Sequence, residues 1–150
     1  MKLKRLLFGL LLLLGISSGA KADTYFPYPL IPDSIGIFQK RCDYLARHFW
    51  DFCDLKKAFS AKAKMAQEFN VYISILKNAN PDSAIASVVR FNKQLEKQPA
   101  DQLFMAECAE NLLYGDTAEM WIDELYLPFA HAVASNKRID KAAKARFAHQ

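Results

Sequence analysis

The three cysteines are the side chains of this sequence best suited to chemistry. Cys42, Cys53 and Cys108 are well separated, and no two of them form a Cys-x-x-Cys pair. The dithiol motif of thioredoxin-like active sites is therefore absent from these 150 residues. An odd number of cysteines leaves at least one thiol free or paired with another chain. The thiols are either small buried hydrophobic groups, or one of them forms a mixed disulfide with a partner.

Cys42 and Cys53 could not pair with each other on one continuous helix. They are eleven residues apart, which separates them by about 16 Å along a helix axis. A disulfide needs Cα atoms within about 7 Å of each other. On this interpretation an internal disulfide would have to use Cys108.

His48 and Asp51 form a second candidate cluster. Their spacing of three places both on one face of a helix. Metal sites use this spacing but need further ligands, and His131 and His149 lie far along the chain. A hydrogen bond between the His48 and Asp51 side chains, or a solvated helix face, is the favoured interpretation. Cys53 follows His48 by five residues, which puts the two on different sides of a helix, so we do not expect His48 to act as its base.

Glu119, Asp123 and Glu124 form an acidic cluster. Paired carboxylates can act as general acid and base, but acidic residues also gather at helix starts because the helix dipole favours them there. No Gly-rich phosphate loop, Gly-x-Ser-x-Gly elbow or His-Glu-x-x-His motif accompanies them. A hydrolase is the least favoured function, and we expect no catalytic residues, no cofactor and no metal site. The sequence favours a protein that is not an enzyme.

Aromatic side chains supply the remaining candidates. Tyr28, Tyr44, Trp50 and Tyr126 are the candidates for binding a partner, because aromatic residues around a groove favour peptide or protein binding. Packing of aromatic rings in one hydrophobic core is the more common explanation of such residues.

The first 22 residues have the pattern of a secretory signal peptide. Lys2, Lys4 and Arg5 precede an apolar run over residues 6–14, and Ala-Lys-Ala at 20–22 provides a cleavage site. The apolar run is too short to span a membrane, and the junction holds no cysteine for a lipid anchor. We expect cleavage there, export to the periplasm and no stable membrane anchor afterwards.

The mature chain has a balanced charge. The signal peptide contains four of the 20 basic residues and none of the 16 acidic ones, so 16 of each remain. A neutral chain gives no electrostatic reason to expect nucleic acid or an anionic membrane as partner. Removal of 22 residues from 150 leaves 128, which fits one domain.

Pro27, Pro29 and Pro32 predict an extended leader over residues 23–32, because each fixes φ and disfavours a helix before it. The aromatic and aliphatic residues of the leader predict that it lies in a groove on a helical body. Apolar residues that recur every three or four positions predict an all-α domain over 33–150. We expect a bundle of five or six antiparallel helices.

Local signals predict where the first two helices lie. Either Asp33 or Ser34 can cap a first helix, which continues to Phe52 with one apolar seam. A second helix is expected over 56–77.

Proline and glycine mark the next two helices. Asn80 is expected to cap a third helix over 81–97 that has a proline at its first position. Pro99 opens a fourth helix, and Gly115 ends it.

The last two helices are predicted from a capping box and a weaker basic pattern. Residues 116–119 read as a capping box for a fifth helix, and apolar spacing places Trp121 in the buried stripe of that helix. Pro128 lies inside its apolar pattern and predicts a kink or a break near Leu127. A basic helix with a solvated face is expected over 139–149.

Four stretches of the sequence carry a resemblance to a known family. They are RCDYLARHFWDFCDLKKAF at 41–59, LEKQP at 95–99, LYGDTAEMW at 113–121 and DELYLPF at 123–129. Together they resemble a helical domain of unknown function found in exported proteins of Gram-negative anaerobes. In that family the helical domain usually precedes a thioredoxin-like thiol-disulfide oxidoreductase domain.

The resemblance covers nearly all of the mature chain and implies no catalytic residues for the helical part. We expect either a shortened relative or a helical module that works alone, in both cases without a Trp-Cys-x-x-Cys active site. It implies an exported, non-catalytic interaction module associated with thioredoxin-like redox proteins. The partner would be a protein or peptide, with a thioredoxin-like domain as one form of it, and not nucleic acid. The alternative is a redox accessory protein that forms a mixed disulfide through a cysteine.

Overall fold

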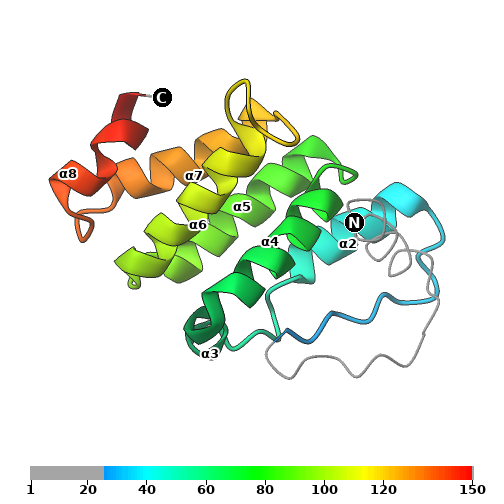
Figure 1. Cartoon of the computed structure of the whole chain (residues 1–150). Helices are drawn as coiled ribbons and strands as arrows, with labels where there is room; N and C mark the ends of the chain where they lie inside the picture. Colours follow the sequence, from blue (N-terminus) through cyan, green and yellow to red (C-terminus); the bar gives the residue numbers. More distant parts are fainter. Residues whose placement is uncertain (1–25, 150) are drawn as a thin grey trace. The chain divides into compact units, whose positions relative to one another are not determined.

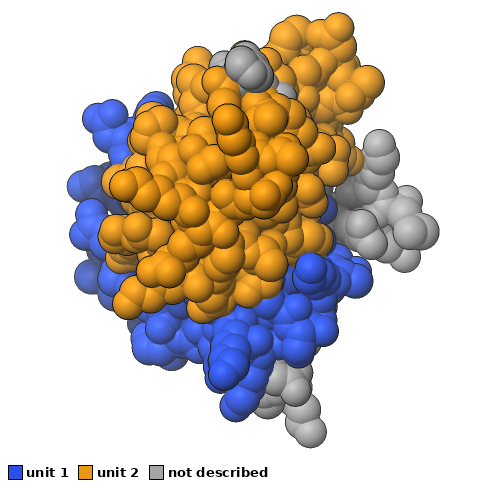
Figure 2. Space-filling view, turned by 90° about the vertical axis from the view of Figure 1, so that its left-hand side faces the viewer, with its two compact units in different colours: residues 1–84 blue, residues 85–150 orange. Residues whose placement is uncertain are grey.

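The structure is a computed structural model that describes residues 26–149. The predicted signal peptide and its cleavage site lie outside the described residues. The chain divides into two compact units, residues 1–84 and residues 85–150, which Figure 2 shows in different colours. The described residues form helices joined by turns and loops, with no strand among them (Figure 1). The predicted all-α fold is confirmed, and no helix in this part of the chain is long and apolar enough to cross a membrane.

The first unit begins with the predicted extended leader. Residues 26–32 form no helix, as their prolines require. Phe26 is 4% exposed, and Pro29 is buried as well. The leader therefore lies against the helical part of its own unit, as its apolar residues predict.

Helix α2 covers Phe38–His48 and begins later than the sequence predicts. Asp33 and Ser34 lie in a turn, which the N–H of Ile35 closes on the Pro32 carbonyl at 3.0 Å. The predicted start at Asp33 or Ser34 is wrong because this turn occupies both residues.

The end of α2 also differs from the prediction. The chain turns after His48, where the N–H of Asp51 donates to the His48 carbonyl at 3.1 Å. The side chain of Asp54 then accepts the N–H of Lys57 at 3.1 Å and caps a new helix. The apolar seam therefore does not continue to Phe52, which is 66% exposed.

The predicted helix over 56–77 is three elements. They are helix α3 (Leu55–Ala58), the 3-10 turn η1 (Phe59–Ala61) and helix α4 (Lys62–Leu76). The Ser60 hydroxyl donates to the Lys57 carbonyl at 2.6 Å, a local bond that competes with a regular helix. Ala61 then leaves the helical region, with φ −114° and ψ 67°. Helix α4 packs beside α2 (Figure 1).

Helices α5 (Pro81–Leu95) and α6 (Pro99–Leu113) confirm the predictions made from proline and glycine. The Asn80 side chain accepts the N–H of Asp82 at 3.0 Å and caps α5. The chain leaves α6 at Tyr114, which is extended with φ −123° and ψ 132°, and Gly115 follows with a φ of 82° that turns the loop.

Helix α7 covers Asp123–Ser135, so the capping box predicted at 116–119 is wrong. The N–H groups of Met120 and Ile122 donate to the last two carbonyls of α6, each at 2.9 Å. Trp121 has a φ of 41°, which a right-handed helix does not allow. The chain therefore folds back onto the end of α6 before α7 begins.

Two smaller differences follow in the second unit. Helix α7 continues through Pro128 to its end, so the predicted break near Leu127 is absent. The basic helix expected over 139–149 is the short helix α8 (Lys141–Lys144) followed by the 3-10 helix η2 (Ala145–His149).

Each unit buries its own set of large apolar side chains. In the first unit they include Phe49, Met65, Phe69, Tyr72 and Leu76, and in the second Phe91, Leu95, Met105, Leu113 and Phe129. In the second unit α6 and α7 pack against each other (Figure 1).

Replacement of Gly115 by Ala should lower the free energy of unfolding by about 1 kcal/mol. The φ of 82° at Gly115 disfavours any side chain, although a Cβ there would meet no atom within 4 Å. The measurement is urea unfolding followed by circular dichroism. Gly36→Ala is the matched control, because Gly36 has open space around it and no positive φ. Equal stability of the two variants would contradict the conformational argument.

Candidate functional site

All three cysteines are free thiols, and burial raises the pKa of each to about 11. The carboxylates of Asp43 beside Cys42 and Glu107 beside Cys108 add to this effect. Because a neighbouring negative charge and burial both disfavour a thiolate, these thiols are almost fully protonated near neutral pH. They are therefore weak nucleophiles as the structure holds them.

The disulfide expectation needs a correction. Because α2 ends at His48, Cys42 and Cys53 do not lie on one helix. The separation between them that was calculated along one helix axis therefore does not apply. The internal disulfide through Cys108 is not formed either.

The His48–Asp51 hydrogen bond predicted from the sequence is confirmed. Nδ1 of His48 and Oδ2 of Asp51 lie 2.6 Å apart. The ring of Tyr44 packs against the imidazole with the centroids 4.5 Å apart. No group of three or more potential metal ligands occurs in residues 26–149, so here the pair orients an imidazole beside a tyrosine ring.

The acidic cluster occupies the start of α7 and the loop before it. Asp123 and Glu124 lie in the first turn of α7, and Glu119 lies in the preceding loop. All three are exposed. Their position is the one that the helix dipole favours, which accounts for the cluster without acid-base chemistry.

The four candidate aromatic residues do not form one surface. Trp50 is 4% exposed and Tyr126 is fully buried, so both are core residues and do not rim a groove. Trp50 packs against Tyr72 with the ring centroids 5.2 Å apart. Tyr126 belongs to the second unit, where burial raises its pKa. Tyr28 and Tyr44 are half-buried, and their partner-binding role stays a prediction.

The leader is fastened to α4 through one buried carboxylate. The hydroxyl of Tyr28 donates to Oε2 of Glu68, and Nζ of Lys64 lies 3.2 Å from Oε1 of the same residue. The ring of Tyr28 packs edge-on against Phe49 with the centroids 5.7 Å apart. Only 6% of Glu68 is exposed, so its charge depends on these two partners. We call this arrangement the Tyr28–Glu68 clamp.

The clamp also covers a thiol. Residues 26–28 of the leader enclose a small space together with Phe49, Trp50 and Cys53, and this space has no room for a water molecule. The leader therefore helps to keep Cys53 away from solvent, which agrees with the raised pKa of that thiol.

The sequence interpretation missed the exposure of Trp121. The apolar pattern assigned this residue to the buried stripe of a helix, but 59% of it is exposed in the loop between α6 and α7. Its positive φ places it outside any helix. Gly115 and the acidic residues after it are compatible with a loop as well as with the start of a helix. The backbone hydrogen bonds from Met120 and Ile122 to the end of α6 show that this segment is a loop.

A known family matches most of this chain. The family is described as a domain of unknown function, DUF5106, and its model matches residues 16–150. The chain belongs to this family. No curated protein matches the chain.

A solved structure shares the fold of this DUF5106 domain. It is the crystal structure of a thioredoxin-like protein from Bacteroides caccae, with a TM-score of 0.76 and 19% sequence identity. The match covers 85% of this chain and 47% of that protein, so this chain spans about half the length of the protein that it resembles. At this identity the likeness shows the fold alone.

Replacement of Tyr28 by Phe should lower the free energy of unfolding by about 1–3 kcal/mol, because the buried Glu68 carboxylate loses a hydrogen-bond donor. The ring that packs on Phe49 is retained in this variant, so the effect isolates the hydroxyl. Urea unfolding provides the measurement.

Tyr44→Phe is the matched control for this clamp variant. The Tyr44 hydroxyl has no hydrogen-bond partner in the part of the chain that the structure describes. Its removal should leave stability within about 0.5 kcal/mol of the parent value. If the two phenylalanine variants were equally stable, the clamp would not hold the leader in the way described.

Proposed function

We propose that this DUF5106 domain is a non-catalytic helical module that binds thioredoxin-like redox proteins outside the cytosol. The observation that carries the proposal is the match of 85% of the chain to about half of a thioredoxin-like protein. A helical domain that accounts for half of such a protein leaves the other half for the redox domain. This supports a role for the helical part in binding or positioning rather than in the redox step itself.

The thiol chemistry favours binding over catalysis. Each cysteine has a pKa of about 11 as a result of burial, whereas reactive cysteines have lowered values and lie in positively charged, accessible surroundings. Export is supported by the sequence pattern of residues 1–22. In an oxidising compartment, burial also protects Cys42 from oxidation, and Cys53 and Cys108 are partly covered.

Tyr44 is the strongest remaining candidate contact for a partner. It lies half-buried on α2, and its ring is held against His48. A fixed aromatic ring with a free edge is a common anchor in protein interfaces, because little side-chain entropy is lost on binding.

The test begins with protein isolated from the periplasmic fraction of its own cells, where the intact mass should match residues 23–150. Calorimetric titration with the thioredoxin-like proteins exported by the same cells should then show saturable binding. Tyr44→Ala should weaken that binding about tenfold, the loss typical of a tyrosine anchor.

Val89→Ala is the control for this titration, because Val89 is also an exposed large side chain, 55% accessible, and lies in the other unit. It should leave the affinity unchanged. Absence of binding to every thioredoxin-like protein tested would contradict the proposed function. Equal weakening by both variants would contradict only the role of Tyr44.

The alternative function, a mixed disulfide with a partner, is tested by thiol labelling. At pH 8 a thiol of pKa 11 should react with a disulfide reagent about 100-fold more slowly than an ordinary cysteine of pKa 9, since only the thiolate attacks. The rate is followed by absorbance in the native protein and again in urea, where all three cysteines should react quickly. One thiol that reacts at the ordinary rate in the native protein would favour the redox accessory function instead.

A further inference from the structure

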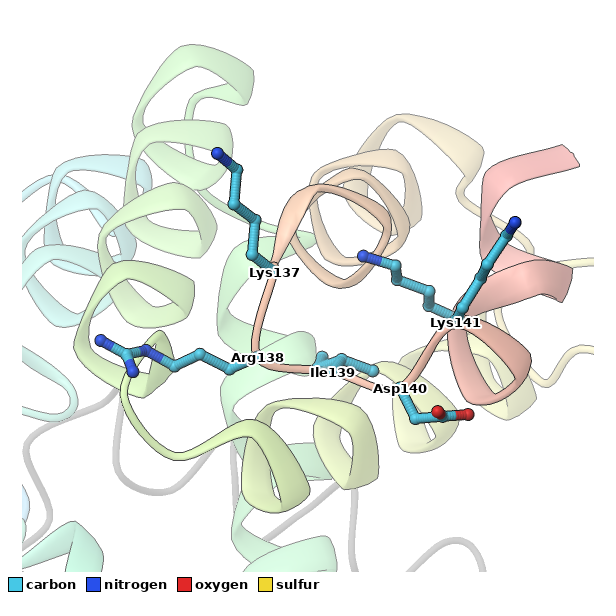
Figure 3. Close-up of a pocket in the computed structure, with 6 residues that line it drawn as sticks. Lys137, Arg138, Ile139, Asp140 and Lys141 are labelled. Carbon is cyan, nitrogen blue, oxygen red and sulfur yellow. The ribbon is translucent and has the colours of Figure 1, made fainter.

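A basic pocket lies beside the loop that joins α7 to α8. The pocket has a volume of about 750 Å³ and is lined by residues 137–141 and Lys144 (Figure 3). Most of this volume is open to solvent, so a ligand there would stay partly hydrated. Four of the six lining residues are cationic, namely Lys137, Arg138, Lys141 and Lys144.

The loop that carries these cations is fixed by a buried amide. Asn136 is 7% exposed, and its Nδ2 donates to Oε1 of Gln102 at 2.7 Å and to the Glu96 carbonyl at 3.0 Å. Its Oδ1 accepts the N–H of Arg138 at 2.9 Å. Ile139 is buried as well, at 6% exposure. The backbone of the pocket is therefore held in place before any ligand arrives.

The acidic residue of the pocket offsets one positive charge but, among the described residues, forms no ion pair with the four cations. The Asp140 carboxylate accepts the N–H groups of Ala142 at 2.9 Å and Ala143 at 3.3 Å, as the cap of α8. Figure 3 shows Asp140 pointing away from Lys137. The ammonium of Lys144 donates to a neutral group, the Asn136 carbonyl, at 3.0 Å.

None of the four cations forms an ion pair with a carboxylate in residues 26–149. Arg138 contributes to lowering the pKa of Glu96, but the ion pair of Glu96, at 2.5 Å, is with Lys93. In the same unit Arg146 is paired, since it lies 3.0 Å from Glu110. The pocket therefore concentrates unpaired positive charge in a chain whose predicted mature form is neutral.

We propose that this pocket binds a multivalent anion that carries phosphate groups. The guanidinium of Arg138 and the three ammonium groups are the donors that phosphate oxygens prefer. In Figure 3 Lys137 and Arg138 point in different directions from the loop, so the cations are spread along the loop rather than directed at one point. An extended ligand with several phosphates would contact more of the cations and relieve their mutual repulsion. Such phosphates could belong to a free oligophosphate or to a lipid surface.

The experiment is calorimetric titration of the purified protein with inorganic tripolyphosphate, and with inorganic monophosphate for comparison. Tripolyphosphate should bind more tightly than monophosphate, and its affinity should fall as NaCl is raised. The double variant Lys137→Gln/Lys141→Gln should weaken tripolyphosphate binding by at least about tenfold. Both side chains are exposed, and neither is a partner in the Asn136 hydrogen bonds, so the fold should be retained.

The matched control is Lys40→Gln/Lys77→Gln, which removes the same charge from exposed positions in the other unit. It should change the affinity by less than about twofold. Equal weakening by the two double variants would overturn the proposal, because binding would then follow net charge alone.

A second titration identifies where the phosphate comes from. Vesicles of phosphatidylcholine with phosphatidylglycerol are compared with vesicles of phosphatidylcholine alone. If the parent protein binds the anionic vesicles and the pocket variant does not, the site is supported and its ligand is a lipid surface. If the parent protein binds tripolyphosphate but no vesicles, the ligand is a free oligophosphate. Absence of both, or tighter binding of a polyglutamate peptide than of tripolyphosphate, would overturn the proposal. None of these outcomes depends on whether a thioredoxin-like protein binds.

Discussion

The carboxylate of Glu68 is the constraint on which the first unit depends. It is 6% exposed, and a buried charge needs partners that replace water. Lys64 supplies one from the same helix, and Tyr28 supplies the other from 40 residues earlier in the chain. The leader is therefore held by an electrostatic requirement as well as by its apolar side chains. Phe49, Trp50 and Cys53 line a small space together with residues 26–28, so the clamped leader also helps to cover the buried Trp50 and the partly buried Cys53.

The parts of the fold that the sequence predicts well are those where one residue type has one structural consequence. Proline suits the first turn of a helix, where its missing N–H costs no hydrogen bond, so the starts of α5 and α6 are correct. Glycine tolerates a positive φ, so Gly115 marks the loop that directly follows α6. Apolar periodicity also finds the large buried residues of both units, because a helix that packs on a core must repeat every three or four positions.

The errors arise where one local pattern fits two structures. Asp33 and Ser34 are suitable for a helix cap and equally for a turn, and the turn is formed. Residues 116–119 match a capping box, but hydrogen bonds to the end of α6 hold that segment as a loop. Aromatic residues likewise fit either a core or a surface: Trp50 and Tyr126 are candidates for partner binding but are buried, whereas Trp121 fits a buried stripe but is exposed. Tertiary contacts decide these cases, and a single sequence does not contain them.

The distribution of charge on the second unit also depends on tertiary contacts that the sequence does not contain. The balance of 16 basic and 16 acidic residues in the predicted mature chain describes a sum, whereas binding depends on where charges remain unpaired. Arg146 is paired with glutamates of α6. The cations beside Asn136 form no such pairs, and the nearby Asp140 carboxylate is oriented toward the first turn of α8 by the N–H groups of Ala142 and Ala143. Asp140 keeps its negative charge, so the four cations around one carboxylate leave an excess of positive charge at the pocket. The local bonds that start α8 fix where this one negative charge lies, and the remaining positive charge can attract an anionic ligand.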